Sequence, residues 1–171
     1  ALDITLSEAS TEGEDLALAR AIRDSGHVVI ASTMAYQETA LVRQWIRMDP
    51  IPAFVAAGAA RGLAHVDLDR DGVVRRVPDA QDAFWKVVIE RANAASPGLL
   101  PPPEAPPGAL IRYLGPDHTY PYVSFYQALD ADTHLPAGAF QDQIVLVGRD
   151  IQASVDAGAA QADLFLTPFT A

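Results

Sequence analysis

The hydrophobic pattern of the first 32 residues predicts a strand, a helix and a second strand. Residues 2–6 alternate apolar and polar positions, as strands with one buried face do. Thr11 followed by Glu14 is a capping-box signature; apolar positions then recur at helical spacing, and Gly26 stands where a helix usually ends. The apolar run at 27–32 is typical of a strand buried on both faces. Together these segments predict a βαβ unit.

The middle of the chain predicts a second helix and a hairpin. Residues 40–48 fit either a short helix or an irregular excursion. Residues 51–57 carry a proline in their first turn and predict a helix. Two alternating runs, at 62–68 and 73–77, flank an Asp-Gly dipeptide, which is a strong signal for a β-hairpin.

The second half predicts a helix at 83–95, strands at 109–114, 143–148 and 163–168, and a short helix from Ser124 to Leu129. The run at 143–148 has the clearest pattern of a buried strand. Six of the thirteen prolines fall within 96–108, which we interpret as a semi-rigid surface connection inside one domain. The whole pattern predicts a single α/β domain over residues 1–171, with a mixed, mostly parallel sheet, helices packed on it and a central β-hairpin.

The charge of the chain excludes several partners. Its formal net charge is −10 and its pI is about 4.6, so it would repel nucleic acid and anionic lipid. No apolar stretch reaches the ~20 residues that span a bilayer. We therefore expect no nucleic-acid partner, and contact with a membrane only through flanking helices outside this chain. Eleven of the twelve basic residues are arginine, which indicates G+C-rich, bacterial coding DNA.

The acidic segment at 67–72 invites a metal-site interpretation. Asp67, Asp69, Asp71 and Gly72 match the first half of a calcium-binding EF-hand loop. The twelfth loop position falls on Pro78, where a bidentate glutamate is required. We therefore expect a hairpin turn at Asp71-Gly72 and no metal.

Arg75 and Arg76 follow this turn. Since side chains alternate along a strand, only one of the two is expected to face a given side. A structural ion pair with Asp67 or Asp69 across the ladder is favoured over an anion-binding role.

The sequence carries no motif for catalysis or for a cofactor. It has no cysteine, no G-x-S-x-G, no phosphate-binding glycine loop and no H-E-x-x-H spacing among its four histidines. If a small-molecule site exists, Arg112 and Tyr113 near the end of a predicted strand are candidates. Tyr36, Arg43 and Trp45 in the excursion before residue 49 are the others, because loops often carry binding groups.

The order of these motifs resembles the CHASE2 family of extracytoplasmic sensor domains. The segments that carry the resemblance are the early helix at 14–22, the strand at 28–31, G-L-A-H-V at 62–66, D-R-D-G-V-V-R-R-V-P at 69–78, I-R-Y-L-G at 111–115, Y-V-S at 122–124, I-V-L-V-G at 144–148 and T-P at 167–168. The family has an aspartate between its last two motifs, and here both Asp156 and Asp163 compete for that place.

The resemblance implies a sensory part of a bacterial transmembrane receptor, outside the inner membrane. It implies a cytoplasmic output that is a nucleotide cyclase, a diguanylate cyclase or phosphodiesterase, a histidine kinase or a Ser/Thr kinase. We expect the domain itself to be no enzyme, to use no cofactor and to respond to a small-molecule or protein stimulus, with a homodimer as one arrangement within the receptor. The alternative is an oligomerisation or protein-interaction module without a small-molecule ligand. A small α/β enzyme ranks last, because no constellation of nucleophile, base or metal ligands stands out.

Overall fold

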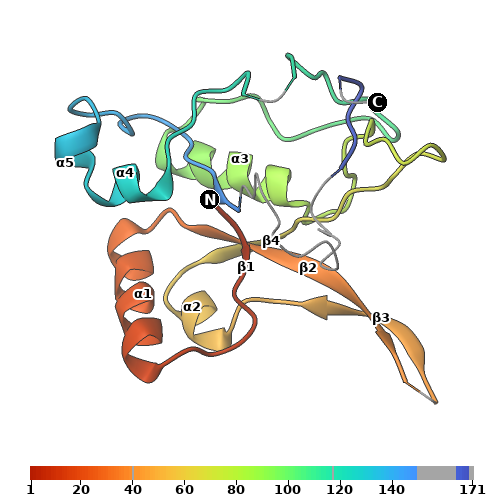
Figure 1. The fold of residues 1–171 in the computed structure, drawn as a ribbon, viewed down its shortest axis with the longest axis horizontal. Coiled ribbons are helices and arrows are strands. Elements are labelled where there is room, and N and C mark those ends of the chain that lie inside the picture. Colours follow the sequence, from red (N-terminus) through yellow and green to blue (C-terminus); the bar gives the residue numbers. More distant parts are fainter. Residues whose placement is uncertain (40, 117, 150–164, 170–171) are drawn as a thin grey trace.

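One long strand organises the sheet of this protein (Figure 1). The computed structural model describes residues 1–39, 41–116, 118–149 and 165–169. Strand β2 (Val29–Glu38) pairs in parallel with β1 (Leu2–Thr5) and β4 (Ala60–Leu63), and antiparallel with β3 (Arg43–Met48). Strand β5 (Val147–Gly148) extends the sheet by pairing in parallel with β1. The sheet is mixed and open, with five strands, and the predicted α/β class is confirmed.

The first helix, α1 (Glu12–Ser25), begins and ends as its sequence predicts. The backbone N–H of Glu14 donates to the hydroxyl of Thr11, and the backbone N–H of Thr11 donates back to the Glu14 carboxylate. At the other end Gly26 takes a left-handed φ of 67° and donates its N–H to the carbonyl of Ile22 at 3.0 Å.

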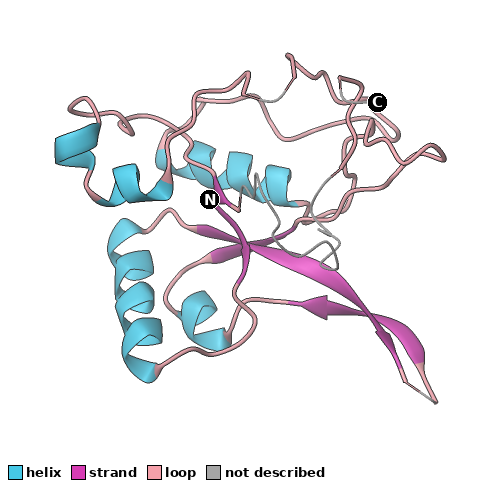
Figure 2. Ribbon diagram, viewed as in Figure 1, coloured by secondary structure: helices cyan, strands magenta, loops and turns pink. Residues whose placement is uncertain are grey.

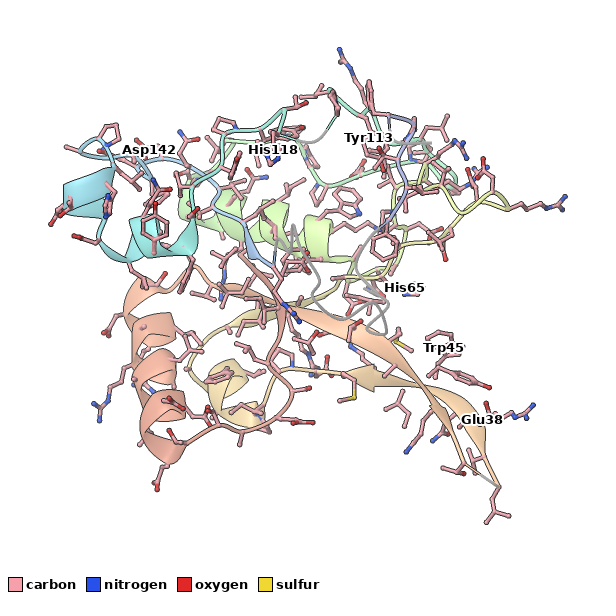
Figure 3. All side chains as sticks on the ribbon, viewed as in Figure 1. Glu38, Trp45, His65, Tyr113, His118 and Asp142 are labelled. Carbon is pink, nitrogen blue, oxygen red and sulfur yellow. The ribbon has the colours of Figure 1, made fainter. Side chains whose placement is uncertain are left out.

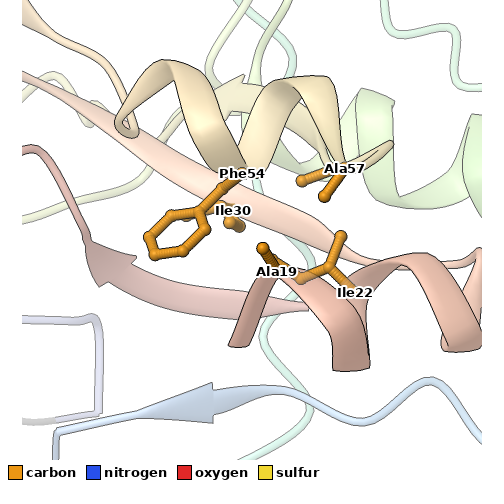
Figure 4. Packing of buried hydrophobic residues seen from close by; sticks show 6 residues of the cluster. Ala19, Ile22, Ile30, Phe54 and Ala57 are labelled. Carbon is orange, nitrogen blue, oxygen red and sulfur yellow. The ribbon is translucent and has the colours of Figure 1, made fainter. Parts of the chain in front are cut away.

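Helices cover both faces of the buried part of the sheet (Figure 2). Helices α1 and α2 (Pro52–Ala56) lie on one face, and α3 (Phe84–Ala95) lies on the other. The α1–α2 side contains a compact apolar cluster of Ala19, Ile22, Ile30, Phe54, Ala57 and Ala59, all at most 7 % exposed (Figure 4). Because side chains alternate along β2, the flanking residues Val29 and Ala31 face away from this cluster, and each is 2 % exposed. Burial on both faces confirms the prediction from the apolar run.

The outer half of β2 departs from the sequence-based expectation. In the segment 40–48 the described residues 43–48 form neither a helix nor an irregular excursion. Instead β3 returns alongside β2 as an antiparallel ribbon, with pairs running from Thr33–Met48 to Glu38–Arg43. We call residues 33–48 the β2–β3 arm; it projects from the sheet in Figure 2. Since solvent reaches both faces of its outer part, it lacks the apolar–polar alternation by which strands are usually predicted.

The predicted central hairpin is present only as a tight turn. The segment 62–68, predicted as the first strand of the hairpin, is not one strand. Its start belongs to β4, which runs parallel to β2, and the rest lies outside the sheet. A single bridge joins Leu68 to Val74, and the N–H of Asp69 donates to the carbonyl of Val73 at 3.0 Å. Gly72 has a φ of 80°, a conformation that glycine adopts without strain.

The prediction of a buried strand at 143–148 is wrong except at its end. Only Val147–Gly148 forms strand, and Ile144 and Leu146 are 42 % and 66 % exposed. Strand β5 pairs with β1 at Leu2 and Asp3. The exposure of Ile144 and Leu146 shows that this apolar run is not covered as a buried strand would be, and a run of sequence letters does not reveal that.

The remaining elements of the second half are short. Helix α4 (Phe125–Leu129) confirms the helix predicted after Ser124, and α5 (Ala131–His134) follows it. The run at 109–114 makes only a bridge between Leu110 and Arg76, and the described end of the chain makes one between Leu166 and Val73. Among all described residues, no helix has the length and apolarity needed to traverse a bilayer.

We predict that Gly62→Ala destabilises the fold. A Cβ atom at Gly62 would lie 2.7 Å from the Cα of Phe84, so β4 and α3 would have to move apart. We expect a loss of about 1–3 kcal/mol in the free energy of unfolding, measured by urea denaturation. Gly13→Ala is the control: a Cβ there meets nothing within 4 Å, so this helical change should be neutral or stabilising. Equal stability of the two variants would contradict the prediction.

Candidate functional site

The β2–β3 arm gathers three of the predicted binding residues on one face. Tyr36 and Trp45 lie directly opposite each other in the ribbon, with their ring centroids 5.3 Å apart. The next pair on the same face is Glu38 and Arg43, whose carboxylate oxygen and guanidinium nitrogen are 2.7 Å apart. Figure 3 labels Glu38 and Trp45 along this arm. Tyr36 is 50 % exposed and Trp45 is 60 % exposed, so these rings are accessible to a ligand.

A third ring extends this face towards the sheet. His65, two residues beyond β4, lies with its ring centroid 6.5 Å from that of Trp45 in an edge-on arrangement. Its Nε2 atom is 3.9 Å from a carboxylate oxygen of Asp67. We call Tyr36, Trp45 and His65 the arm aromatic cluster. No sequence signal linked His65 to a tryptophan twenty residues earlier.

The cluster has the chemistry of a recognition surface rather than of a catalytic centre. Tyrosine and tryptophan offer rigid apolar faces for stacking together with hydrogen-bond donors at their edges. The adjacent Arg43 and Glu38 supply one charge of each sign. Such a surface can hold an aromatic or apolar group and orient a polar group beside it.

A network of charges fixes the arm to the sheet. One carboxylate, Asp49, accepts hydrogen bonds from the Ser32 hydroxyl at 2.7 Å, from Arg47 Nε at 2.7 Å and from Arg61 Nη1 at 3.0 Å. Arg47 also places Nη1 2.6 Å from Asp82, two residues before α3. These five residues, the arm anchor, join the base of the arm to β4 and to the start of α3.

The electrostatics of the arm anchor favour its charged state. Partial burial alone would raise the pKa of Asp49, but the hydrogen bonds from Ser32 and Arg47 and the charges of Arg47 and Arg61 outweigh it and lower that pKa. Ser32 itself is fully buried, so its hydroxyl needs this partner. The arm anchor is therefore a structural network that holds the base of the arm to the sheet.

We predict that Arg47→Met loosens the arm whereas Arg43→Met does not. Both arginines lie in β3 and pair with a carboxylate, but Arg47 has a side chain 31 % exposed and Arg43 one 73 % exposed. Loss of partly buried, charge-assisted hydrogen bonds should cost about 2 kcal/mol, and loss of the exposed pair at most about 0.5 kcal/mol. Hydrogen exchange of the amides in residues 33–48 should accelerate only in Arg47→Met. Equal protection in the two variants would count against the anchor.

The turn at 69–76 is an ion-pair cluster. Arg75 makes a bidentate contact with Asp71, at 2.8 Å to each carboxylate oxygen, and a third bond to Asp69 at 3.1 Å. Arg76 also reaches Asp69, with Nε 3.3 Å from its carboxylate. The predicted ion pair with Asp69 is confirmed, whereas Asp67 lies near His65 instead.

Arg75 and Arg76 both contact Asp69, with guanidinium nitrogens 3.1 and 3.3 Å from its carboxylate. Adjacent long side chains thus reach the same carboxylate in a segment that makes isolated bridges and no regular strand. Among the described residues no group of three or more His, Cys, Asp or Glu side chains is placed to hold a metal ion. The carboxylates of this turn are directed at guanidinium groups.

We predict that Asp71 titrates far below other carboxylates. The bidentate hydrogen bonds from Arg75 hold the pKa of Asp71 at about 2, compared with an ordinary value of 3.8. Because the folded-state pKa is depressed, this pair stabilises the fold above pH 3.8 and the contribution is lost as the pH falls through about 2. Carboxyl NMR titration should show this pKa, and Arg75→Gln should move it back towards 3.8. An ordinary pKa in the unaltered protein would refute the assignment.

Comparison with known proteins shows the family to which this chain belongs. The family model described as "CHASE2 domain" matches residues 1–170. The chain belongs to the CHASE2 family. Comparison with curated proteins and with solved structures gave no match. CHASE2 domains are extracellular sensory domains of receptors and are not catalytic.

The other predicted binding residues of this CHASE2 domain lie apart from the arm. The Tyr113 hydroxyl donates to the carbonyl of Val74 at 2.9 Å, and partial burial raises the pKa of Tyr113. This tyrosine therefore binds the backbone of the ion-pair turn itself, and Figure 3 shows it well away from Trp45. Arg112 beside it is exposed. The family aspartate, whether Asp156 or Asp163, falls outside the described residues.

Proposed function

We propose that this CHASE2 domain is the extracytoplasmic sensor of a bacterial transmembrane receptor and that its β2–β3 arm recognises the stimulus. The cytoplasmic output it regulates is a nucleotide cyclase, a diguanylate cyclase or a kinase. The observation that carries the proposal is the arm aromatic cluster, where Tyr36 and Trp45 are half exposed yet held in a defined ribbon. An aromatic surface at a protruding, anchored element is suited to binding.

The fold supports transmission from the arm to the sheet. Strand β2 is continuous, so a displacement of its outer half is passed directly to its buried half between β1 and β4. The Arg47–Asp82 contact gives a second route, to the start of α3. A ligand that binds one position of the arm more tightly than another would shift the population of the two states, as signalling requires.

The chemistry of the cluster sets the class of ligand. Stacking on Tyr36 and Trp45 favours a planar or apolar group, and the exposed guanidinium of Arg43 favours a neighbouring carboxylate or phosphate. Glu38, which is paired with Arg43 across the ribbon, favours a cationic or hydroxyl group of the ligand. A small molecule with both an aromatic or apolar part and a polar head fits this surface.

A second candidate function is supported by a different part of the surface. Tyr120, Tyr122, Phe125, Tyr126 and Leu129, in and before α4, are each between 63 % and 74 % exposed. Exposed apolar side chains in such number mark interaction surfaces in soluble proteins. This observation favours an oligomerisation or protein-interaction module, with or without a small-molecule stimulus.

We predict that Trp45→Ala abolishes ligand recognition while Gln44→Ala preserves it. Gln44 directly precedes Trp45 in β3 and points to the opposite face of the ribbon, so it is a matched control. A thermal-shift screen of metabolites and ions should yield a compound that raises the melting temperature of the unaltered domain and of Gln44→Ala but not of Trp45→Ala.

Arg112→Ala tests the other candidate position in the same screen. A compound whose effect is lost in Arg112→Ala and retained in Trp45→Ala would move the site away from the arm. In the full-length receptor, Trp45→Ala should uncouple the output from the stimulus. A receptor whose output is unchanged when the whole domain is deleted would refute the sensor function itself.

A further inference from the structure

The outer edge of the β2–β3 arm is an open strand edge. Strand β3 stands at the end of the strand order, and β2 is its neighbour within the described sheet. Figure 2 shows the arm projecting beyond the other strands. A two-stranded ribbon is only marginally stable by itself, and an uncovered edge strand is a template for a further strand. The edge of β3 is therefore a surface on which another strand can add.

The register of the arm shows how its backbone groups are directed. Across the tip, the N–H of Thr39 donates to the carbonyl of Val42 at 2.8 Å, so these two residues form a hydrogen-bonded pair. Hydrogen-bonded and non-hydrogen-bonded pairs alternate along an antiparallel ribbon. The pairs 37–44, 35–46 and 33–48 are therefore hydrogen-bonded, and the pairs 38–43, 36–45 and 34–47 are not.

This alternation leaves a row of backbone groups on the outer edge. The N–H and C=O groups of Arg43, Trp45 and Arg47 point away from β2, and on that side of β3 they make no backbone hydrogen bond to any described residue. The same alternation predicts that the carbonyl of Ser32 points away from the β3 side of β2. It does so, since it accepts from the N–H of Ala64 on the β4 side at 2.8 Å.

The charges of the arm suit a second copy of this chain as the partner. Residues 39–48 contain no Asp or Glu, in a chain whose net charge is −10. Arg43 is paired with Glu38, and Arg47 with Asp49 and Asp82, so both arginines are neutralised within their own copy. Two acidic chains can therefore approach at this edge without opposing carboxylates, and strand pairing requires no new ion pair.

Pairing of β3 with the β3 of a second copy closes by symmetry. Two identical antiparallel strands are related by a two-fold axis, so the same edge on each copy forms the whole interface and no further edge is left to extend it. The rest of each copy then lies at opposite ends of the joint ribbon. This arrangement keeps the acidic parts of the two chains apart.

Like charges exclude two registers of this pairing. An axis at Arg43 places the two copies of this arginine directly opposite each other. An axis at Trp45 places Arg43 opposite Arg47 of the second copy. Like charges directly opposite in a ladder are destabilising, so neither register is favoured.

Space excludes a third register and leaves one. An axis at Ile46 carries the tip of each arm past the end of β3 to residue 51 of the other copy, where the Ile51 N–H already donates to the Leu6 carbonyl at 2.9 Å. An axis at Gln44 keeps the contact within the two arms. It also sets Val42, which is 47 % exposed, opposite the half-buried Ile46 of the second copy.

We propose that two copies of this chain pair antiparallel through the outer edges of β3, with Gln44 at the two-fold axis. The backbone of Arg43 exchanges hydrogen bonds with the backbone of Trp45 in the second copy, and the contact occurs twice. The inference goes beyond the proposed function, because it uses the backbone edge of the arm and not the ring faces of Tyr36 and Trp45.

Cysteine cross-linking tests the register, since the chain contains no cysteine. In the proposed dimer the two Gln44 positions form a non-hydrogen-bonded pair with Cα atoms about 4.5 Å apart, which a disulfide can span. Gln44→Cys should therefore give a disulfide-linked dimer under mild oxidation.

Gln37→Cys is the matched control for cross-linking. Gln37 lies opposite Gln44 on the same face of the arm, and both side chains are exposed. In the dimer the two β3 strands separate the two Gln37 positions by about 14 Å, beyond the reach of a disulfide. Gln37→Cys should cross-link at least about 10-fold more slowly than Gln44→Cys.

Sedimentation equilibrium tests the backbone contact. Arg43→Pro removes an outward N–H and no hydrogen bond to β2, so it should weaken dimerisation about 10-fold or more, because the lost bond occurs twice. Arg43→Ala also loses the ion pair with Glu38 but keeps the N–H, so it should dimerise as the unaltered chain does. In both variants the amides of Gln44 and Ile46, which point towards β2, should stay protected from hydrogen exchange, which shows that the arm is intact.

Four results would overturn the inference. They are a chain that stays monomeric, equal cross-linking of Gln44→Cys and Gln37→Cys, a dimer that Arg43→Pro leaves unchanged, and faster cross-linking of Ile46→Cys than of Gln44→Cys. A monomer in which a ligand-induced thermal shift still depends on Trp45 would overturn the dimer and leave the proposed function intact.

Discussion

The structure depends on one strand, β2, whose two halves have different neighbours within the same sheet. The inner half of β2 lies between two parallel neighbours and is buried on both faces, while its outer half pairs with β3 in an exposed ribbon. The change occurs at Ser32, which is fully buried and donates its hydroxyl to Asp49. A strand that leaves the core must exchange apolar packing for other interactions, and here these are the charged hydrogen bonds of Arg47 to Asp49 and Asp82. The arm therefore projects from a base that ion pairs hold to the rest of the fold.

Local rules predicted the elements whose stabilisation is local. The capping box at Thr11, the left-handed Gly26 and the doubly buried start of β2 follow from a few neighbouring residues, and the structure confirms them. The buried strand expected at 143–148 is wrong because apolar letters do not guarantee cover, and Ile144 and Leu146 are exposed. The arm was not predicted because the interactions that stabilise it are not local. They are the cross-strand pairs of β2 and β3 and the contact of Arg47 with Asp82, which lies 35 residues further along the chain.

The candidate site could be predicted only in part from the sequence. Tyr36, Arg43 and Trp45 were singled out as polar and aromatic groups in an unassigned segment, and the antiparallel register explains why they share a face. Residues directly opposite in a ribbon point to the same side, so the pairs 36–45 and 38–43 form one surface. His65 joins them through the fold alone. Tyr113, chosen by the rule that sites lie beyond strand ends, instead donates its hydroxyl to a backbone carbonyl, because residues 109–114 form a bridge and not a strand.

Recognition at the arm, as proposed for this CHASE2 domain, would act on the rest of the fold through the arm anchor. Arg47 contacts both Asp49 and Asp82, so the same residue that fixes the arm also contacts the segment that leads into α3. A ligand that shifts the arm would therefore change contacts on two sides of the sheet, along β2 and at the start of α3.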